Sequence, residues 1–265
     1  MRRLIASLRI FVSGAWLSYI ALFHWTHPAS YIASKIVMPI ASMLFFLYLG
    51  MSATGHDTAQ FYIVGNALQI VAVSAIYGVT MTVSRERNMG TLIYLIGSPA
   101  NRLAIFMGRA FFNILDGMLG VVIGFIVGDL IGLDLTSANL PGLAITILIS
   151  SISTCGLGLM LGSISLTALN VMFVNNTIFF LLLVFSGANL QLDKMPAWMQ
   201  VVSKWLPLTR SIKSARLFVS GASLTEVSLL LASEFAIGLA YALAGFIFFR
   251  WFEFQARKRG TLEAF

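Results

Sequence analysis

The sequence is poor in charged residues. Asp, Glu, Lys and Arg together make up only 10% of its 265 residues, whereas hydrophobic residues make up 58%. A soluble domain carries about 25% charged residues, because its whole surface faces water. A chain this poor in charge lacks the polar surface that a soluble protein needs. The composition therefore predicts an integral membrane protein.

Cysteine, histidine clusters and catalytic motifs are also missing. The single cysteine, Cys155, excludes a disulfide within the chain and a cysteine-based metal site. His24 and His27 share a helical spacing, but they have no carboxylate near them and too few ligands for a metal ion. The motifs H-E-x-x-H, G-x-S-x-G and G-x-x-x-x-G-K-[ST] do not occur. The sequence therefore predicts no catalytic residues, no metal and no ATP-binding site in this chain.

The basic excess has a simple explanation in a membrane protein. The formal net charge is +7 and the pI is near 9.9. Such values are also found in proteins that bind nucleic acid, but Lys and Arg accumulate in the cytoplasmic loops of membrane proteins. We therefore expect the lipid bilayer as a partner, and no nucleic acid.

Six long apolar segments are present. A helix rises about 1.5 Å per residue, so about 20 apolar residues are needed to cross the hydrocarbon of a bilayer. Strands of a membrane barrel would instead be short and would alternate in polarity. The pattern predicts an all-α integral membrane protein with six transmembrane helices, approximately over residues 31–49, 62–81, 106–127, 143–161, 169–185 and 227–249.

The N-terminal segment, residues 1–28, has three possible explanations. It is a signal peptide, a seventh span, or an amphipathic helix that lies in the headgroup layer. With six spans, both ends of the chain lie on the same side of the membrane. That side then holds three basic residues near the N-terminus, four near the C-terminus and four after the second span, eleven of the 17 in all. We therefore predict six spans, both termini in the cytoplasm, and an interfacial helix at the N-terminus.

Residues 186–222, between the fifth and sixth predicted spans, are too polar to cross a bilayer. The segment mixes apolar residues with basic ones, and it contains Pro196, Pro207, Trp198 and Trp205. Neither half of it is apolar over a stretch long enough to span. Two short helices that dip partway into the membrane and return would fit, with the tryptophans at the membrane interface.

Several polar residues lie inside the predicted spans. Such residues are costly in lipid, so they usually face the interior of the bundle or a water-filled path. They could form hydrogen bonds between helices, or they could line a transport path. For the amides both roles weigh equally, whereas the higher cost of a carboxylate favours a functional role for the two acidic residues. The candidate path residues are Asn66, Gln69, Asn113, Asp116, Asn175, Asn176 and Glu234.

Glycines recur at four-residue spacing in two of the spans. Gly120, Gly124 and Gly128 follow this pattern in the third span, and Gly158 and Gly162 follow it in the fourth. Small residues at this spacing allow the backbones of two helices to approach closely. The contact could lie within one chain or between two chains, and contact within one chain is the more common case.

Residues 84–99 interrupt the apolar pattern after the second span. The stretch begins with the charged residues Arg85, Glu86 and Arg87. Apolar residues at helical spacing follow, and Gly-Ser-Pro at positions 97–99 ends the pattern, because proline disfavours a helical residue before it. The pattern predicts a short surface helix that either lies on the lipid headgroups or docks against a cytosolic partner.

Three stretches carry a resemblance to a known family. Residues 84–99, SRERNMGTLIYLIGSP, resemble the R-E-R-x-x-G-T-L-E-x-L-x-x-S-P signature of ABC-2 type transporter permeases, the membrane subunits of bacterial ATP-binding cassette exporters. Residues 186–216 are similar to the family's segment of spaced prolines and tryptophan. The tail, residues 250–262, is similar to its basic C-terminus. The resemblance covers nearly the whole chain.

The resemblance implies a role for each stretch within a single permease domain over residues 1–265. Residues 1–28 would be an interfacial elbow helix, and residues 84–99 a coupling helix seated in the ATPase subunit. Residues 186–222 would form two re-entrant outer helices. The residues that the resemblance assigns to contact with the ATPase are Arg85, Glu86, Arg87, Gly90, Thr91 and Leu92.

Two positions depart from the family pattern. Ile93 stands where the family often has glutamate, so this chain departs from the family at one acidic contact with the ATPase. Leu190-Gln191 stands where a proline is common, which concerns the first re-entrant turn.

By this resemblance the chain is a non-catalytic permease subunit in the bacterial cytoplasmic (inner) membrane. It would pair with a second permease, identical or homologous, and with two cytosolic ATPase subunits that bind ATP and Mg²⁺. The expected exported cargo is lipophilic or amphipathic: a drug, as in multidrug resistance, an antimicrobial peptide, a lipid or a lipid-linked glycan. Two alternatives are a membrane-embedded enzyme and a proton-coupled secondary transporter, each using Asp116 and Glu234.

Overall fold

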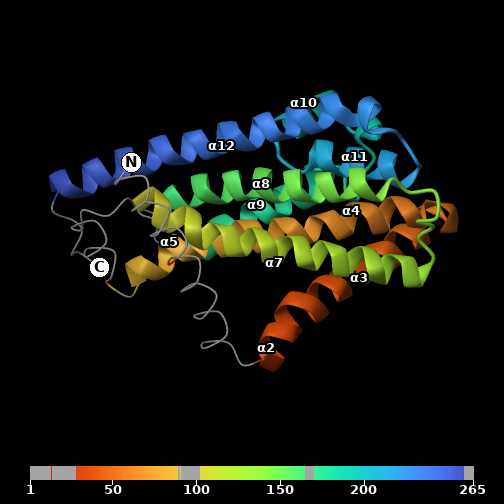
Figure 1. Ribbon diagram of the computed structural model, residues 1–265, viewed down its shortest axis with the longest axis horizontal. Coiled ribbons are helices and arrows are strands. Elements are labelled where there is room, and N and C mark those ends of the chain that lie inside the picture. The colour runs from red at the N-terminus through yellow and green to blue at the C-terminus, as the bar shows by residue number, and fades with distance from the viewer. Residues whose placement is uncertain (1–12, 14–27, 89, 91–101, 165–169, 260–265) are drawn as a thin grey trace.

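The computed structural model describes residues 13, 28–88, 90, 102–164 and 170–259 of the chain. Every regular element within these residues is a helix, which confirms the predicted all-α class. The long helices lie side by side in an elongated bundle (Figure 1). In chain order the elements are α2 (Pro28–Ile32), π-helical η1 (Ala33–Val37), α3 (Met38–Thr54), η2 (His56–Thr58), α4 (Ala59–Ala72), π-helical η3 (Val73–Tyr77), α5 (Gly78–Asn88), α7 (Arg102–Ile131), α8 (Leu140–Ile164), α9 (Val171–Phe185), η4 (Leu192–Lys194), α10 (Ala197–Trp205), α11 (Thr209–Val219) and α12 (Leu224–Arg259).

Five helical stretches of the described chain are long and apolar enough to cross a membrane. In chain order they correspond to the first, second, third, fourth and sixth predicted spans, and they are called spans one, two, three, four and six below. The fifth predicted span corresponds to α9, an apolar helix of 15 residues that is about 22 Å long at ~1.5 Å per residue. The count of six spans therefore stays a prediction, as does the N-terminal elbow, most of which lies outside the described residues. The five stretches are Ala33–Thr54, His56–Thr82, Phe111–Ile131, Leu140–Ile164 and Leu224–Phe252.

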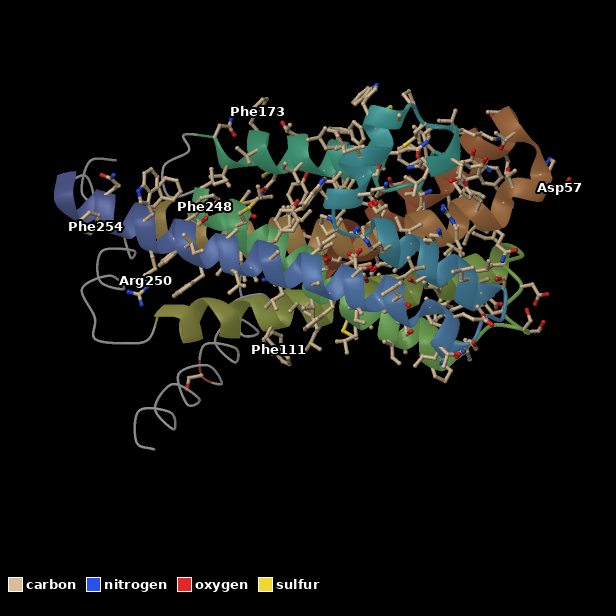
Figure 2. All side chains as sticks on the ribbon, turned by 90° about the horizontal axis from the view of Figure 1, so that it is seen from above. Asp57, Phe111, Phe173, Phe248, Arg250 and Phe254 are labelled. Atoms are coloured by element: carbon tan, nitrogen blue, oxygen red, sulfur yellow. The ribbon has the colours of Figure 1, made fainter. Side chains whose placement is uncertain are left out.

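The two ends of the bundle carry different segments. Asp57 and Arg250 lie at opposite ends (Figure 2). The Asp57 end holds the turn between α3 and α4, the loop between α7 and α8, and the short helices α10 and α11 (Figure 1). The Arg250 end holds the last turns of α5 and α12 and the first turn of α7. The segment between α9 and α12 thus holds the short α-helices α10 and α11 after the 3-10 turn η4, whereas re-entry of α10 and α11 into the membrane stays a prediction.

Helices α8 and α12 pack with their backbones close together. Gly156 on α8 faces the carbonyl oxygen of Gly238 on α12, and a Cβ atom added at Gly238 would lie 2.5 Å from the Cα atom of Ser153. Further along the same pair, a Cβ atom added at Gly245 would lie 2.7 Å from the backbone nitrogen of Met160. Glycine is required at these positions because any side chain would hold the two backbones apart.

The glycines of span three face span two of the same chain. Gly120 and Gly124 on α7 pack against Ile70 of α4, and Gly128 packs against Ile63. A Cβ atom at Gly120 or at Gly124 would lie 2.9 Å from the Ile70 side chain. The small-residue pattern on α7 is therefore used for packing within the chain, the more common of the two alternatives.

Span two lies at the centre of the bundle. Every residue from Tyr62 to Ala72 is buried, and α3, α7, α8 and α11 pack around this helix. The outside of the bundle is apolar, with Phe111, Phe173, Phe248 and Phe254 exposed and pointing outward (Figure 2). An apolar exterior of this kind suits a bundle of helices surrounded by lipid. Each helix also satisfies its own backbone hydrogen bonds, which lipid cannot do.

Candidate functional site

The polar residues of α4 contact the segment that follows α9. Asn66 Nδ2 donates to Oδ1 of Asn189 at 2.8 Å and to the carbonyl oxygen of Tyr62 at 2.9 Å. One turn further along α4, Gln69 Oε1 accepts from the hydroxyl of Ser186 at 3.4 Å. Gln69 Nε2 is buried and has no hydrogen-bond partner among the described residues. These two amides therefore join span two to the segment that leads into α10.

Arg216 of α11 reinforces the same junction, although no role was assigned to it from the sequence. Its Nη2 atom donates to the carbonyl oxygens of Phe61 at 2.9 Å and of Ala188 at 3.1 Å. Its guanidinium carbon lies 3.5 Å from the centroid of the Phe61 ring, a close cation–π contact. Gly65 of α4 leaves room for this contact, since a Cβ atom there would lie 2.8 Å from Nη2. Arg216 thus ties α11 to the start of α4.

Glu234 of α12 is fully buried and caps α11. One carboxylate oxygen accepts from the backbone N–H of Leu208 at 2.6 Å, and the other from that of Arg210 at 3.3 Å. These amide groups lie at the N-terminus of α11, where unpaired N–H groups and the helix dipole favour a negative charge. Leu208 has a φ of 73°, a conformation that is rare for leucine and that the surrounding contacts must hold in place. Glu234 therefore links span six to α11.

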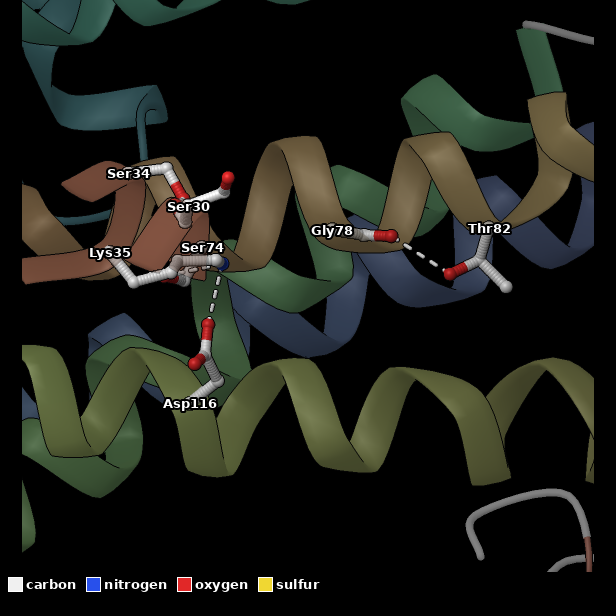
Figure 3. Close-up of polar contacts among 7 residues, drawn as sticks. All are labelled: Ser30, Ser34, Lys35, Ser74, Gly78, Thr82 and Asp116. Atoms are coloured by element: carbon white, nitrogen blue, oxygen red, sulfur yellow. Dashed lines mark hydrogen bonds and ion pairs between the residues drawn. The ribbon is translucent and has the colours of Figure 1, made fainter. Parts of the chain in front are cut away.

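Asp116 of α7 forms an ion pair with Lys35 of span one. Lys35 Nζ lies 2.5 Å from Asp116 Oδ2 and 3.4 Å from Ser74 Oγ of η3. Figure 3 shows the lysine reaching across from span one, with Ser74 beside the pair. A carboxylate inside a membrane needs such a partner, and this one lies 81 positions away in the chain. The signal that could have identified Lys35 is the presence of opposite charges in two different predicted spans.

The remaining candidates lie on α7 and α9. The side chain of Asn113 packs against Gly78, so that α7 approaches α5 closely there. Asn176 Oδ1 accepts from the hydroxyl of Tyr77 at 2.6 Å, which joins α9 to η3. Asn175 is 0% exposed, and neither polar atom of its amide has a hydrogen-bond partner among the described residues. Asn175 is therefore a buried polar group in the described chain that still needs a partner.

The candidate path residues fall into separate groups. Asn66 and Gln69 bond to the segment after α9, Asp116 to span one, Asn176 to η3, and Glu234 to α11. These contacts join helices of one chain. Hydrogen bonding between helices was one of the two roles that the sequence left open for the amides. A role in a transport path stays a prediction. Among the described residues, no group of three or more His, Cys, Asp or Glu side chains is placed to hold a metal ion.

Span two continues without a break into the charged stretch that follows it. α4, η3 and α5 together form one helical rod from Ala59 to Asn88. The backbone of Arg85, Glu86 and Arg87 therefore belongs to the end of this rod. Residues 84–88, the first part of the predicted coupling helix, thus continue the helix of span two, and apart from Gly90 the rest of that prediction lies outside the described residues. The pattern of apolar residues marks where a helix lies in apolar surroundings, and it does not mark where the helix stops.

Gly90 follows the end of the rod. It has a φ of 68°, the left-handed conformation that commonly follows the last turn of a helix and that favours glycine. A Cβ atom at this position would meet nothing within 4 Å, so the need for glycine is conformational rather than steric. Thr91 and Leu92 belong to residues 91–101, which lie outside the described part of the chain. The coupling helix itself therefore stays a prediction.

Comparison with known proteins identifies one family. A sequence profile described as ABC-2 type transporter matches residues 16–219. The matched range contains every described helix from α2 to α11, together with the charged end of span two. No curated protein sequence matches the chain.

Proposed function

Because the chain belongs to the ABC-2 type transporter family, we propose that it is one of two permeases in an ATP-driven exporter. Membership of the family makes it the membrane permease of an ABC transporter, a transport subunit that associates with an ATPase. The observation that carries the proposal is the family match over residues 16–219. The long apolar helices of the described chain support it.

The partners follow from what the chain lacks. It has no phosphate-binding loop of the Walker type, so ATP and Mg²⁺ would be bound by two cytosolic ATPase subunits. A second permease, identical or homologous, would complete the membrane domain. The Arg250 end of the bundle would then face the cytoplasm, because the basic residues at the end of α5 and in the tail lie at that end.

The helical rod of span two is the proposed route from the ATPase to the transport path. Its charged end carries Arg85, Glu86 and Arg87, and its other half is packed at the centre of the bundle. Because the backbone of this helix is continuous, a displacement at its charged end reaches the middle of the bundle. Closure of the ATPases around ATP would thus shift the centre of the permease.

The proposed cargo is lipophilic or amphipathic. The two acidic candidate residues are engaged within the chain, Asp116 by Lys35 and Glu234 by the N-terminus of α11. What remains for a cargo is apolar surface with scattered amides, which suits a lipophilic molecule better than an ion. The same contacts weigh against an enzyme or a proton-coupled transporter built on these two carboxylates, because different elements hold them.

A double substitution at the end of α5 tests the coupling role. Glu86→Ala with Arg87→Ala removes two charges without changing an apolar span, so the abundance of the protein in the membrane should stay the same. A surface charge pair contributes only about 0–1 kcal/mol to stability. If these residues contact the ATPase, a tagged double variant should retain much less of the ATPase in a pull-down. It should also lose efflux of a lipophilic dye.

The chain offers a matched control for this experiment. Asp193 and Lys194 are also neighbouring residues of opposite charge, and both are exposed at the other end of the bundle. Asp193→Ala with Lys194→Ala should leave ATPase retention and dye efflux unchanged. Full retention of the ATPase with normal efflux in the Glu86 and Arg87 variant would contradict the proposed coupling role.

A reporter at the C-terminus tests the orientation. Eleven of the 17 Lys and Arg residues lie on one side when the chain has six spans, as counted above. A fluorescent protein or phosphatase fused after Phe265 should therefore report a cytoplasmic location. An external location would contradict the six-span arrangement and would make the N-terminal segment a true span.

A further inference from the structure

An ion pair and two π-helical turns meet at one level of the bundle. Lys35 lies in η1, Ser74 lies in η3, and Asp116 lies on α7 (Figure 3). π-Helical turns are rare, and they are frequently found at functional sites. Here two of them supply neighbouring side chains, Lys35 and Ser74, from helices 39 positions apart. The coincidence of both turns with an ion pair marks this level as a site of its own.

The beginning of span one is less deeply buried than the rest of that span. None of the side chains described between Ala29 and Val37 is buried. Further along the same helix, Met43 and Leu47 are 1% and 0% exposed. Figure 1 shows α2 inclined away from the long helices of the bundle. The ion pair of Lys35 with Asp116 thus joins the α2–η1 segment (residues 28–37) to α7 at a level where the described side chains of this segment are half-buried or exposed.

Lysine at this position has two favourable places for its charge. In the structure its ammonium group is paired with Asp116, and the lysine side chain is 26% exposed. Its long, flexible stem also allows the charge to reach the headgroup layer when the helix moves outward. The Asp116 side chain is shorter and 11% exposed, so its charge stays in the bundle. Each charge needs either its partner or water. Positions of the α2–η1 segment in which Lys35 reaches neither Asp116 nor the headgroup layer are therefore unfavourable.

Ser74 connects the ion pair to the charged end of α5. It lies on the helical rod of span two, which extends about 21 Å beyond it to Asn88. A π-helical turn uses i→i+5 instead of i→i+4 hydrogen bonds. Conversion of η3 to α-helix would therefore rotate and shift α5 relative to α4. Such a shift would also move Ser74 relative to Lys35.

We propose that Lys35, Asp116 and Ser74 form a latch that holds the α2–η1 segment against α7 and opens once in each transport cycle. The second part of this proposal rests on the proposed transport function. Displacement of α5 by the ATPase alters η3, the lysine leaves for the headgroup layer, and the α2–η1 segment swings outward. The open latch gives an amphipathic cargo a lateral way into the bundle between span one and α7.

The position of span one can be measured on the purified chain without any partner. Spin labels at Ile32→Cys and Phe111→Cys, which are 50% and 42% exposed, report the distance between span one and α7. Cys155→Ala removes the native cysteine, which is buried. In lipid nanodiscs this background should give a short, narrow distance distribution by pulsed electron paramagnetic resonance. Lys35→Gln or Asp116→Asn should raise the ratio of long to short distances at least about tenfold.

Further variants separate loss of the latch from misfolding. Lys35→Asp with Asp116→Lys exchanges the charges and should restore the short distance. Lys35→Met with Asp116→Leu leaves no unpaired charge that could prevent folding. It should still lengthen the distance, because lipid competes equally for apolar side chains. Lys204→Gln and Asp129→Asn remove exposed charges elsewhere, and they should leave the distance unchanged.

The outcomes test the latch and its role separately. Single variants that keep the wild-type distance, or an exchanged pair that behaves like the single variants, would overturn the latch. In the complex with the ATPase, a bifunctional thiol reagent that joins Ile32→Cys to Phe111→Cys should abolish dye efflux while ATP hydrolysis continues. Normal efflux in the cross-linked protein would overturn opening in each cycle. If the distances change as expected but no ATPase binds the chain, the latch stands and the proposed function fails.

Discussion

Spans one and two are neighbours in the sequence but are packed in opposite ways. In the most apolar stretch of span two 83% of the residues are buried, whereas in span one the share is 17%. Both stretches are apolar enough to cross a membrane, so composition does not explain the difference. The position of each span in the bundle explains the difference, because span two has α3, α7, α8 and α11 around it and span one lies at the edge.

The difference separates two mechanical roles. The part of span two that is packed on all sides cannot move without its neighbours, so a displacement that reaches it is passed on to the helices around it. The beginning of span one, which precedes the buried Met43 and Leu47, can swing without opening the core, so it is suited to be the moving part. The ion pair between Lys35 and Asp116 joins these roles, because it ties the edge helix to the packed bundle beside Ser74.

The largest effect should come from a side chain forced between span two and α8. A Cβ atom added at Gly158 would lie 2.8 Å from the carbonyl oxygen of Ala75 on span two, and backbone atoms cannot move aside. Gly158→Leu should therefore lower stability by about 1–3 kcal/mol or more, measured by thermal unfolding in detergent. Ala144→Leu, at an exposed position of the same helix, should unfold like the wild type. Equal unfolding temperatures for both variants would contradict the close packing of span two.

A smaller effect is expected at α11, which packs on span two and is capped from span six. Glu234→Ala leaves the buried N–H groups of Leu208 and Arg210 without their acceptor, a loss of about 1–3 kcal/mol. Glu234→Gln keeps one carbonyl oxygen that can accept from Leu208, so it should lose less. Both values can be read from the same unfolding experiment. A wild-type unfolding temperature in Glu234→Ala would show that α11 does not depend on this cap.

The smallest effect is expected on the outward face of span one. Phe45 is 61% exposed, and lipid can replace most of its contacts. Phe45→Ala should therefore change stability by no more than about 0.5 kcal/mol. Leu47→Ala, two residues further along and fully buried, should lose stability measurably in the same assay. A large loss in Phe45→Ala would mean that this face is covered by protein, which would end the contrast between spans one and two.

The positions of the helices followed from the sequence to within a few residues. The prediction over residues 31–49 compares with Ala33–Thr54, and that over 227–249 with Leu224–Phe252. The length of an apolar stretch predicts such helices well, because this length is set by the thickness of the bilayer and not by the neighbouring helices. The continuation of span two to Asn88 was missed, since a helix can outlast its apolar stretch.

The polar residues show the limit of this reasoning. Asp116 and Glu234 were singled out as groups too costly to leave alone in a membrane, and each has a partner within the chain, whereas a functional role for them stays a prediction. Their partners were not found, because Lys35 lies 81 positions from Asp116 and Leu208 lies 26 positions from Glu234. Arg216 was passed over for the same reason, since its partners on α4 and after α9 are distant in the chain.

The sequence by itself determined what depends on consecutive residues. The backbone hydrogen bonds of a helix are internal to it, and the thickness of the bilayer sets the length of its apolar stretch. The fold class, the helix positions and the family could therefore be predicted from the sequence. Only the tertiary structure decided which helix lies at the centre, which at the edge, and which buried charge meets which partner. Those outcomes depend on the order and rotation of the helices around one another. The structure settles that order by close backbone packing, as at Gly156 and Gly238, and no single segment contains it.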